Sequence, residues 1–328
     1  MAAGEFNLIK ELLAPLAKGV AGAFELGDDA AFLESSDYIV SKDLLVEGVH
    51  FPKGADLGAV AKRSLRVNLS DLAAKGAKPF GYFLGCVWPK GTDREDVAAF
   101  ADALLQDQET FKLKLLGGDT TVHKAAAGPL TISITAVGKP ARGGMIVRHG
   151  AKEGNDLYVS GTIGDAKLGL LAEQKPSQVP TSHREYFLER FWCPSPRLGL
   201  GWALSGVASA AIDISDGLIG DIGHIAARSK VGILIESHRI PISEALAEYV
   251  STKKNKEKAI LDAAAFGDDY EIAFTAPQSL RRSVEMASNL TKTPITRIGS
   301  VKNGEGVTIV DEQGDFLEIE DAGFDHFA

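Results

Sequence analysis

The stretch Asp213-Ile214-Ser215-Asp216-Gly217-Leu218 directly follows the apolar run 208–212 and shows the pattern that organises this chain. Such a run predicts a buried strand, and Ser-Asp-Gly after it predicts a turn. In an extended chain Asp213 and Ser215 point the same way, so Asp213 and Asp216 meet only if the backbone turns at Ser215. An N-cap Ser215 with Asp216 in the first helical turn is the alternative interpretation. That alternative leaves Asp213 unexplained in an otherwise apolar strand.

Short Asp-rich segments recur along the chain, and most of them border strand-like runs. The others are Gly27-Asp28-Asp29, Ser41-Lys42-Asp43, Ser70-Asp71, Gly117-Gly118-Asp119-Thr120 and Gly267-Asp268-Asp269-Tyr270-Glu271. Aspartate also collects in loops for structural reasons. Carboxylates gathered at one edge of a sheet, however, repel each other unless cations neutralise them. Because carboxylate oxygens without His or Cys suit Mg2+ bound together with phosphates, the pattern predicts chemistry on a polyphosphate.

Composition and charge narrow the function further. The 328 residues are 45% hydrophobic, which is enough for two globular domains with their own cores. With 44 acidic against 35 basic residues, the net charge of −9 disfavours binding to nucleic acid or to an anionic membrane. Cys86 and Cys193 lack metal-ligand spacing, and no apolar run approaches the length of a membrane span. We therefore expect a cytoplasmic protein without nucleic-acid or membrane partners.

The hydrophobic pattern alternates between strands and helices in both halves. Helices are expected at 5–17, 57–77, 95–111, 165–171, 215–227, 242–250, 257–265 and 279–290. Strands are expected at 30–33, 38–40, 80–88, 113–116, 130–138, 156–160, 208–214, 232–235, 271–275 and 307–310. A Gly- and Pro-rich segment at 139–155 marks a domain boundary, giving domains 1–139 and 140–328. The fold class is therefore α/β or α+β with two domains.

Single motifs leave alternatives open. In Gly117-Gly118-Asp119 the glycines would let the backbone approach a phosphate whose Mg2+ Asp119 holds, or the segment is a turn with an Asx cap. Asp71 is either a metal ligand or an exposed helical residue paired with Lys75 four positions on. His50 alone indicates no site. The chain has no Gly-x4-Gly-Lys-Ser/Thr loop and no protein-kinase signature, so ATP would be bound in another way.

Taken in order, these segments resemble the thiamine-monophosphate kinase family over almost the whole chain. In the first half the resemblance rests on Gly4-Glu5-Phe6, Gly27-Asp28-Asp29-Ala30-Ala31, Asp43-x-Leu45-Val46-Glu47-Gly48-Val49-His50-Phe51, Asn68-Leu69-Ser70-Asp71-Leu72-Ala73-Ala74 and Gly117-Gly118-Asp119-Thr120-Thr121. In the second half it rests on Arg148-x-Gly150-Ala151-Lys152, Ser160-Gly161-x-x-Gly164, Pro194-Ser195-Pro196-Arg197, Ile212-Asp213-x-Ser215-Asp216-Gly217-Leu218, Asp269-Tyr270-Glu271 and Gly323-Phe324-Asp325-His326-Phe327. So many ordered segments make the resemblance specific.

The resemblance implies transfer of the γ-phosphoryl group of ATP to thiamine monophosphate. It implies the two-domain fold of the aminoimidazole-ribonucleotide-synthetase-like superfamily, with a mixed N-terminal sheet that pairs across a homodimer and a C-terminal α/β domain. ATP and several Mg2+ would lie in a groove between domain 1–139, which binds Mg-ATP and dimerises, and domain 140–328, which completes the site for ATP and thiamine phosphate.

Position by position, the resemblance also implies site residues. The implied metal ligands are Asp29, Ser41, Asp43, Asp71, Asp119, Asp213 and Asp216. The implied ATP contacts are Phe111, Gly118, Asp119, Arg148 and Ser215, and the implied thiamine-phosphate contacts are His50, Asp269 and Phe324. Two positions depart from the family: Lys42 replaces the common Thr beside Asp43, and Asp268 replaces Glu. Lys42 points either into the phosphate site or, by strand alternation, away from it.

The chemistry of the residues agrees with this assignment. A phosphate monoester has a second pKa of about 6, so the acceptor is mostly a dianion at neutral pH and needs no general base. It needs charge neutralisation, which metals held by Asp43 and Asp119 would supply together with Arg148. No residues suggest a nucleophile for a phosphoenzyme, so we expect direct in-line transfer.

Three rival functions are distinguishable. Selenophosphate synthetase has a reactive Cys or selenocysteine in its N-terminal segment, whereas residues 1–85 contain no Cys. Aminoimidazole ribonucleotide synthetase would lack the closing segment 323–327. A non-catalytic nucleotide sensor is disfavoured because all the metal-type aspartates are present.

The run 80–88 is apolar on both faces. Such a run is either buried within the monomer or paired across a dimer. Together with the resemblance, it predicts a homodimer formed through the first domain by pairing of sheet edges that include 80–88.

Overall fold

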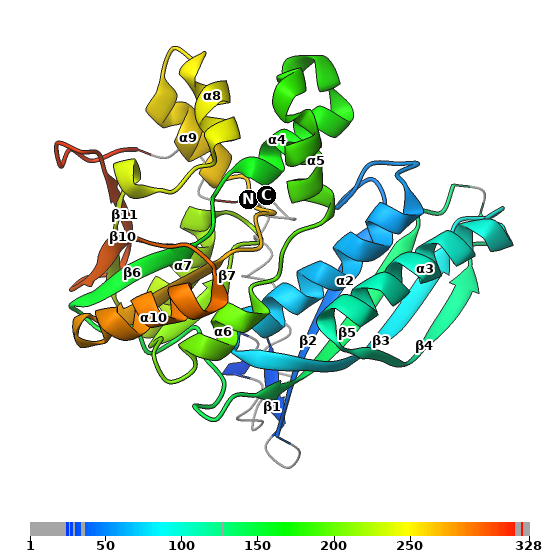
Figure 1. The fold of residues 1–328 in the computed structure, drawn as a ribbon, viewed down its shortest axis with the longest axis horizontal. Coiled ribbons are helices and arrows are strands. Elements are labelled where there is room, and N and C mark those ends of the chain that lie inside the picture. Colours follow the sequence, from blue (N-terminus) through cyan, green and yellow to red (C-terminus); the bar gives the residue numbers. More distant parts are fainter. Residues whose placement is uncertain are drawn as a thin grey trace.

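A computed structural model describes residues 24–25, 27–28, 30–33, 37–125, 127–318 and 323. Within them the chain forms two β-sheets with helices packed on them, so the expected mixed α/β class is confirmed (Figure 1). The helix expected at 5–17 lies outside the described residues. None of the described helices is long and apolar enough to cross a membrane.

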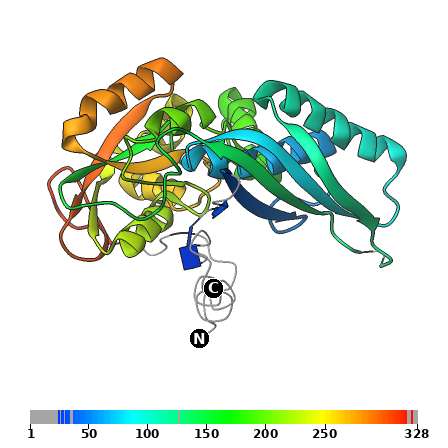
Figure 2. The ribbon, with the colours of Figure 1, turned by 90° about the horizontal axis from the view of Figure 1, so that it is seen from below.

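The first sheet has five strands in the order β1-β2-β5-β3-β4. In that order they are β1 (Ala31–Leu33), β2 (Tyr38–Val46), β5 (Thr131–Pro140), β3 (Ala77–Trp88) and β4 (Lys114–Val122). Neighbours are antiparallel except for the parallel pair β3 and β4. Helices α2 (Leu57–Ala74) and α3 (Arg94–Phe111) lie on one side of this sheet (Figure 2). We call the opposite side the outer face.

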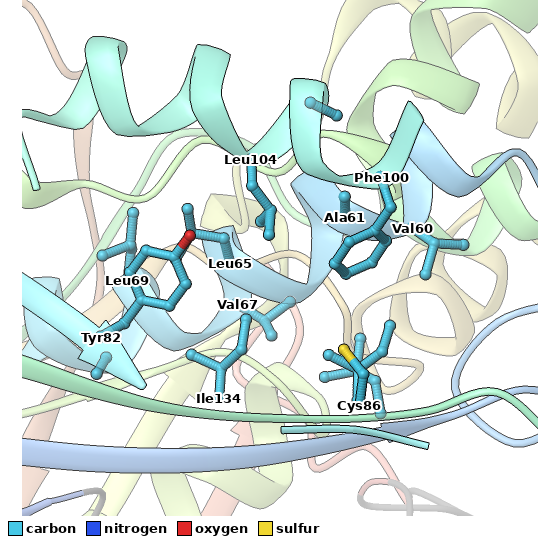
Figure 3. Packing of buried hydrophobic residues seen from close by; sticks show 14 of the residues in the cluster. Val60, Ala61, Leu65, Val67, Leu69, Tyr82, Cys86, Phe100, Leu104 and Ile134 are labelled. Atoms are coloured by element: carbon cyan, nitrogen blue, oxygen red, sulfur yellow. The ribbon is translucent and has the colours of Figure 1, made fainter. Parts of the chain in front are cut away.

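Strand alternation and helical periodicity build the core between this sheet and its helices. In Figure 3, Leu65 and Leu69 of α2 lie near Leu104 of α3 and Ile134 of β5. All four side chains are almost fully buried. Burial of a side chain of this size contributes roughly 1.5–3 kcal/mol, so this packing fixes the position of α2 over the strands.

Helix α2 is the element that both halves share. Its N-cap Asp56 accepts a hydrogen bond from the backbone N–H of Ala59, and the chain leaves the helix at Gly76 with φ 67°. A Cβ at Gly76 would lie 3.1 Å from the carbonyl oxygen of Gly201, so glycine suits the position for space as well as for conformation. The helix contacts β2, β3 and β5 of the first sheet and β7 and β9 of the second.

The second sheet has six strands in the order β11-β8-β10-β6-β9-β7. In that order they are β11 (Gly306–Val310), β8 (Gly232–Glu236), β10 (Ile295–Lys302), β6 (Asn155–Ser160), β9 (Ile272–Pro277) and β7 (Ala210–Asp213). The pair β11 and β8 is parallel and the other pairs are antiparallel. Apolar residues on both faces predict helices on both sides.

Seven α-helices follow in the described part of the second half. They are α4 (Asp165–Gln174), α5 (Arg184–Trp192), α6 (Leu198–Leu204), α7 (Leu218–Ser229), α8 (Glu244–Ser251), α9 (Lys256–Ala264) and α10 (Arg281–Thr291). Helix α7 packs against β7, β8 and β11, whereas α6 and α10 pack together over another part of the second sheet. Helices α4, α5, α8 and α9 share a smaller core at the top of Figure 1. The elements α5, α6 and β10 were not predicted.

Three strand predictions need correction. The strand expected at 38–40 extends to Val46, so Ser41 and Asp43 lie within β2 and not in a loop after it. Residues 80–88 belong to β3, which lies between β5 and β4, so this run is not a sheet edge. The strand expected at 113–116 is longer and exposed, and β4 includes the Gly117-Gly118-Asp119 segment that was expected to be a turn. The reason lies at Gly118, where a Cβ would be 1.8 Å from the carbonyl oxygen of Leu84. Glycine therefore lets β4 pair closely with β3.

The boundary between 139 and 140 stays a prediction. The first sheet ends at Pro140 and the second begins at Asn155, which agrees in position with the Gly- and Pro-rich segment. Helix α2, however, contacts strands of both sheets.

We predict that Gly118→Ala lowers the free energy of unfolding by about 1–3 kcal/mol, because β4 must move away from Leu84 to make room for the methyl group. Gly117→Ala is the matched control, since its Cβ would lie 3.4 Å from the Phe83 ring, an ordinary contact. Urea denaturation measures both variants. Equal losses in the two variants would contradict this account of the strand pairing.

Candidate functional site

A cleft of about 380 Å3 opens beside α2, between β2 and the loops around β7 and β9. This volume is typical of a small-molecule site. The aspartates that line the cleft come from four separate segments and are Asp43, Asp71, Asp213, Asp216 and Asp268. The expectation that acidic segments far apart in sequence converge is therefore met for these residues.

Strand alternation brings β2 and α2 together at this point. Ser41 and Asp43 are two positions apart, so both point to the side of the sheet that α2 covers. The Ser41 hydroxyl donates a hydrogen bond to Asp71 Oδ2. The backbone N–H of Asp43 donates to Asn68 Oδ1 at 3.1 Å. The side chains of Asn68 and Asp71 thus hold α2 in place against β2.

The loop after β7 presents Ser215 and Asp216. Helix α7 begins at Leu218, its N-cap is Gly217, and no side chain caps it, so the alternative interpretation of Ser215 as an N-cap is wrong. The carboxylate of Asp221 instead accepts the backbone N–H groups of Ser215, Asp216 and Gly217 at 3.0, 3.1 and 3.2 Å. Ser215 and Asp216 are left to line the cleft.

The carboxylates repel each other where water is largely excluded: Asp213 is buried, and Asp43 and Asp71 are partly buried. Burial, followed by the charges of Asp213 and Asp216, raises the pKa of Asp43 to about 7. Burial and the charges of Asp43 and Asp213 raise the pKa of Asp71 well above its ordinary value. Burial also raises the pKa of Asp213. Such shifts are typical of sites that bind a cation or carry out charge-dependent chemistry.

Two cations, buried Lys75 and partly buried Arg148, lie next to these aspartates. The Lys75 ammonium pairs with Asp28 at 3.0 Å and donates to the carbonyl of Ala211 at 2.9 Å. The backbone N–H of Arg148 donates to the other oxygen of Asp28 at 2.8 Å. Burial lowers the pKa of Arg148, and the charge of Asp28 opposes that effect. The exposed pairing of Asp71 with Lys75 is therefore not what the structure shows, since Lys75 is fully buried against the second half.

The donor set fits Mg2+ shared with a ligand. Among the residues that the structure describes, no three carboxylate, histidine or cysteine side chains are arranged to hold a metal ion by themselves. Mg2+ commonly uses one or two carboxylates and completes its octahedron with water and substrate phosphates. Oxygen donors from Asp43, Asp71, Asp213 and Asp216 around one cleft suit that mode.

The three residues expected to contact thiamine phosphate do not all lie in the cleft. His50 lines the cleft, and its Nδ1 accepts the backbone N–H of Val46 at 3.0 Å. Asp269 is buried and accepts the backbone N–H groups of Gly164 at 2.8 Å and Ala166 at 3.5 Å, at the start of α4. Burial raises the pKa of Asp269 to about 8. Phe324 lies outside the described residues.

Asp268, the neighbour of Asp269, is the one of the two aspartates that faces the cleft. Asp268 lines it and forms an ion pair of 2.5 Å with Arg63 of α2. Tyr270 donates to Asp268 at 3.1 Å, and the Arg63 guanidinium lies 4.2 Å from the centre of the Phe191 ring. Asp268 and the ring of Tyr270 therefore line the cleft together, whereas Phe191 is buried behind Arg63.

Several implied residues do not join the cleft within one chain. Asp43 of β2 pairs with Ile134 of β5, Ile134 pairs with Leu84 of β3, and Leu84 pairs with Gly118 of β4. Gly118 and Asp119 therefore lie three strands away from Asp43, on exposed β4. Phe111 packs beneath Arg66, 5.4 Å from its guanidinium carbon. Asp29 lies outside the described residues.

Lys42 follows the outward alternative. Its ammonium donates to Ser133 Oγ on the outer face, opposite to the face of Asp43.

Some site residues were missed, and part of the signal was available. Arg63, Val67 and Asp71 line the cleft at four-residue spacing on α2, and Lys75 continues the series. That spacing follows one side of a helix, so the helical pattern pointed to Arg63 and Lys75. Asp221 sits four residues after Gly217, one turn into α7. Asp28 adjoins Asp29, and no local signal separated their roles.

Comparisons with known proteins identify the family of this chain. Residues 27–139 match the family model of the AIR synthase related protein, N-terminal domain. The thiamine-monophosphate kinase of Caulobacter vibrioides is 40% identical over 93% of this chain and 86% of its own length. That of Escherichia coli strain K12 is 36% identical over 100% of this chain and 99% of its own length.

A solved structure of AaThiL complexed with AMPPCP and TMP has a TM-score of 0.84 at 30% identity and covers 99% of this chain and 97% of its own. The aminoimidazole-ribonucleotide-synthetase-like fold that the resemblance implies is confirmed by this likeness and by the family model. With full-length curated relatives at this identity, the chain belongs to the thiamine-monophosphate kinase family.

Proposed function

We propose that this chain phosphorylates thiamine monophosphate to thiamine diphosphate with ATP as phosphoryl donor. The observation that carries the proposal is the convergence of Asp43, Asp71, Asp213 and Asp216 in one cleft beside Arg148 and Lys75. The names of the curated relatives and the AMPPCP and TMP in the AaThiL complex support it.

The transfer is direct and in line, without a phosphoenzyme. The acceptor phosphate is mostly a dianion at neutral pH, so no general base is required, and none of the residues lining the described cleft forms a nucleophile–base pair. The residues act by position and charge. Arg148 supplies a cation, Ser215 contacts the nucleotide, and the loop held by Asp221 keeps Asp216 facing the phosphates.

The aspartates of the cleft would serve together as ligands for several Mg2+ ions. Bound Mg2+ neutralises the charge of the approaching phosphates. We assign Ser41, Asp43, Asp71, Asp213 and Asp216 to holding it, together with Asp29 as implied by the resemblance. Burial and mutual repulsion, which raise the pKa of Asp43 and Asp71, favour cation binding at this cluster.

The acceptor occupies the end of the cleft near His50 and Asp268. Thiamine carries a cationic thiazolium and an aromatic pyrimidine, which suit a wall of carboxylate and aromatic groups such as Asp268 and Tyr270. Phe324 is a further aromatic contact on the resemblance. Asp269 contributes by holding the start of α4, since its carboxylate is already engaged there.

A homodimer completes the proposal. The outer face of the first sheet exposes Leu44 (51%), Phe83 (46%) and Phe80 (42%), an apolar surface that α2 and α3 do not cover. A second copy on this face would lie against exposed β4, which carries Gly118 and Asp119, whereas Phe111 lies on the side covered by the helices. Domain 140–328 supplies the remaining contacts. Free Cys86 and Cys193 suit a reducing cytoplasm.

The direct test is an assay of purified protein with ATP, Mg2+ and thiamine monophosphate, with thiamine diphosphate measured by fluorescence. Formation of thiamine diphosphate and ADP in equal amounts supports the proposal. Turnover with another acceptor of the superfamily, or none with any acceptor, would overturn it.

We predict that Asp43→Asn, Asp71→Asn and Asp119→Asn each lower kcat roughly 100-fold or more, because each loses a charge that neutralises the phosphates. Asp102→Asn, an exposed position on α3, is the matched control and keeps the parent kcat. Near-parent kcat in any two of the three variants at saturating Mg2+ would refute the cluster. The Asp119 variant reports on the contribution of a second copy.

We predict a dimer of the 34.8-kDa chain in solution, and we predict that Phe83→Glu on the outer face disrupts it. The new carboxylate would be buried against a second apolar face at a cost of several kcal/mol. Val97→Glu on α3, at 39% exposure, is the control that stays dimeric. Light scattering at micromolar concentration gives the masses. A monomeric parent would rule out this part of the proposal.

A further inference from the structure

Arg197 of the Pro194-Ser195-Pro196-Arg197 segment takes part in a buried ion-pair cluster outside the cleft lining. Its guanidinium donates two hydrogen bonds to Glu271, from Nε to Oε2 at 2.6 Å and from Nη2 to Oε1 at 2.5 Å. Glu271 is fully buried and also accepts Ser160 Oγ at 2.6 Å and Arg190 Nη2 at 3.2 Å. A bidentate pair of this kind fixes both the place and the orientation of a carboxylate.

Glycine makes room for this arrangement. A Cβ at Gly161 would lie 2.1 Å from Glu271 Oε1, so a larger residue there would displace the carboxylate. Burying a carboxylate is unfavourable unless it is paired and hydrogen-bonded. The cluster meets that condition, which makes Glu271 a firm anchor at the start of β9.

The residues just before this anchor have an unusual backbone. Asp268 has φ 63° and Tyr270 has φ 50°, the left-handed region that residues other than glycine seldom adopt. Such conformations cost on the order of 1 kcal/mol or more each and persist where the surroundings hold them. Both residues line the cleft. The turn 268–270 therefore depends on what fixes it at either side.

Backbone hydrogen bonds connect this turn to the acidic loop after β7. The N–H of Asp268 donates to the carbonyl of Ser215, and the N–H of Tyr270 donates to that of Ile214, both at 2.8 Å. The N–H of Ile214 donates back to the carbonyl of Glu271 at 2.8 Å. A shift of Glu271 would therefore move loop 214–216 as well as the turn.

We propose that Arg197 is a positioning residue for phosphoryl transfer. Through Glu271 it holds the strained turn 268–270, and through the backbone bonds it holds Ser215 and Asp216 in the cleft. The inference rests on the proposed function for its role in turnover, whereas the mechanical link is independent of the reaction.

The test compares Arg197→Lys with Arg281→Lys. Lysine keeps the charge but cannot form the two-pronged contact. Arg281 is the matched control, because its Nε and Nη2 donate in the same way to the buried carboxylate of Asp156, at 2.6 and 2.8 Å. Neither Arg281 nor Asp156 lines the cleft. The readouts are kcat, the Tm of the free protein, and the gain in Tm on adding Mg2+ with AMPPCP.

We expect Arg197→Lys to lower kcat about tenfold or more and to reduce the ligand-induced gain in Tm, because small misplacements of positioning groups are costly to rate. We expect Arg281→Lys to keep the kcat and the ligand-induced gain of the parent, whatever its effect on the Tm of the free protein. Parent values of kcat and ligand-induced gain in Arg197→Lys would overturn the inference, as would equal losses in both variants.

The two proposals fail in different ways. If the parent forms no thiamine diphosphate, the proposed function fails, and the ligand-induced gain in Tm still tests whether Arg197 holds the loop. If the parent is active and Arg197→Lys is equally active, the positioning inference alone fails.

Discussion

Electrostatic repulsion among buried and partly buried carboxylates is the constraint on which the cleft depends. Asp43, Asp71 and Asp213 come from a strand of the first sheet, from α2 and from a strand of the second sheet. Burial and mutual charge raise the pKa of Asp43 and Asp71, so their ionised forms are unfavourable together. A fold that nevertheless collects them favours whatever cation neutralises them.

Helix α2 makes this convergence possible because it contacts both sheets. Its apolar side packs in the first core, where Leu65 and Leu69 are fully buried. Its polar side places three groups against the second half: Arg63 pairs with Asp268, Asp71 lines the cleft, and Lys75 donates to Ala211. These polar contacts are long-range, so the geometry of the cleft depends on how the two halves meet on one helix.

Much of the fold could be predicted, because strand and helix periodicities are local properties. Helix α2 and strand β5 appear close to their expected bounds. The role of β4 could not be predicted, because the close approach at Gly118 depends on its partner strand. The short helices α5 and α6 were missed because their positions follow from packing more than from a long periodic pattern.

The site was predictable in its chemistry and less so in its geometry. Asp43, Asp71, Asp213 and Asp216 converge as expected, although Asp43 lies within β2 and Asp71 within α2. Adjacent residues, however, differ in role: Asp268 faces the cleft while Asp269 caps α4, and left-handed backbone at Asp268 decides which is which. Local sequence does not determine such a choice, since the backbone contacts that hold the turn come from Ser215 and Ile214 in the loop after β7.

The central claim is that the carboxylate cluster is destabilising in the metal-free fold and is retained for cation binding. The pKa of Asp43 is raised to about 7 in the folded protein, above its value in the unfolded chain, so stability from this group is greatest at low pH and is lost as the pH rises through about 7. The most direct measurement is urea denaturation of the parent and Asp43→Asn at pH 8, with and without Mg2+. The account predicts that the metal-free variant is at least as stable as the parent and that Mg2+ stabilises the parent more. A metal-free variant less stable than the parent, with equal stabilisation of both by Mg2+, would contradict it.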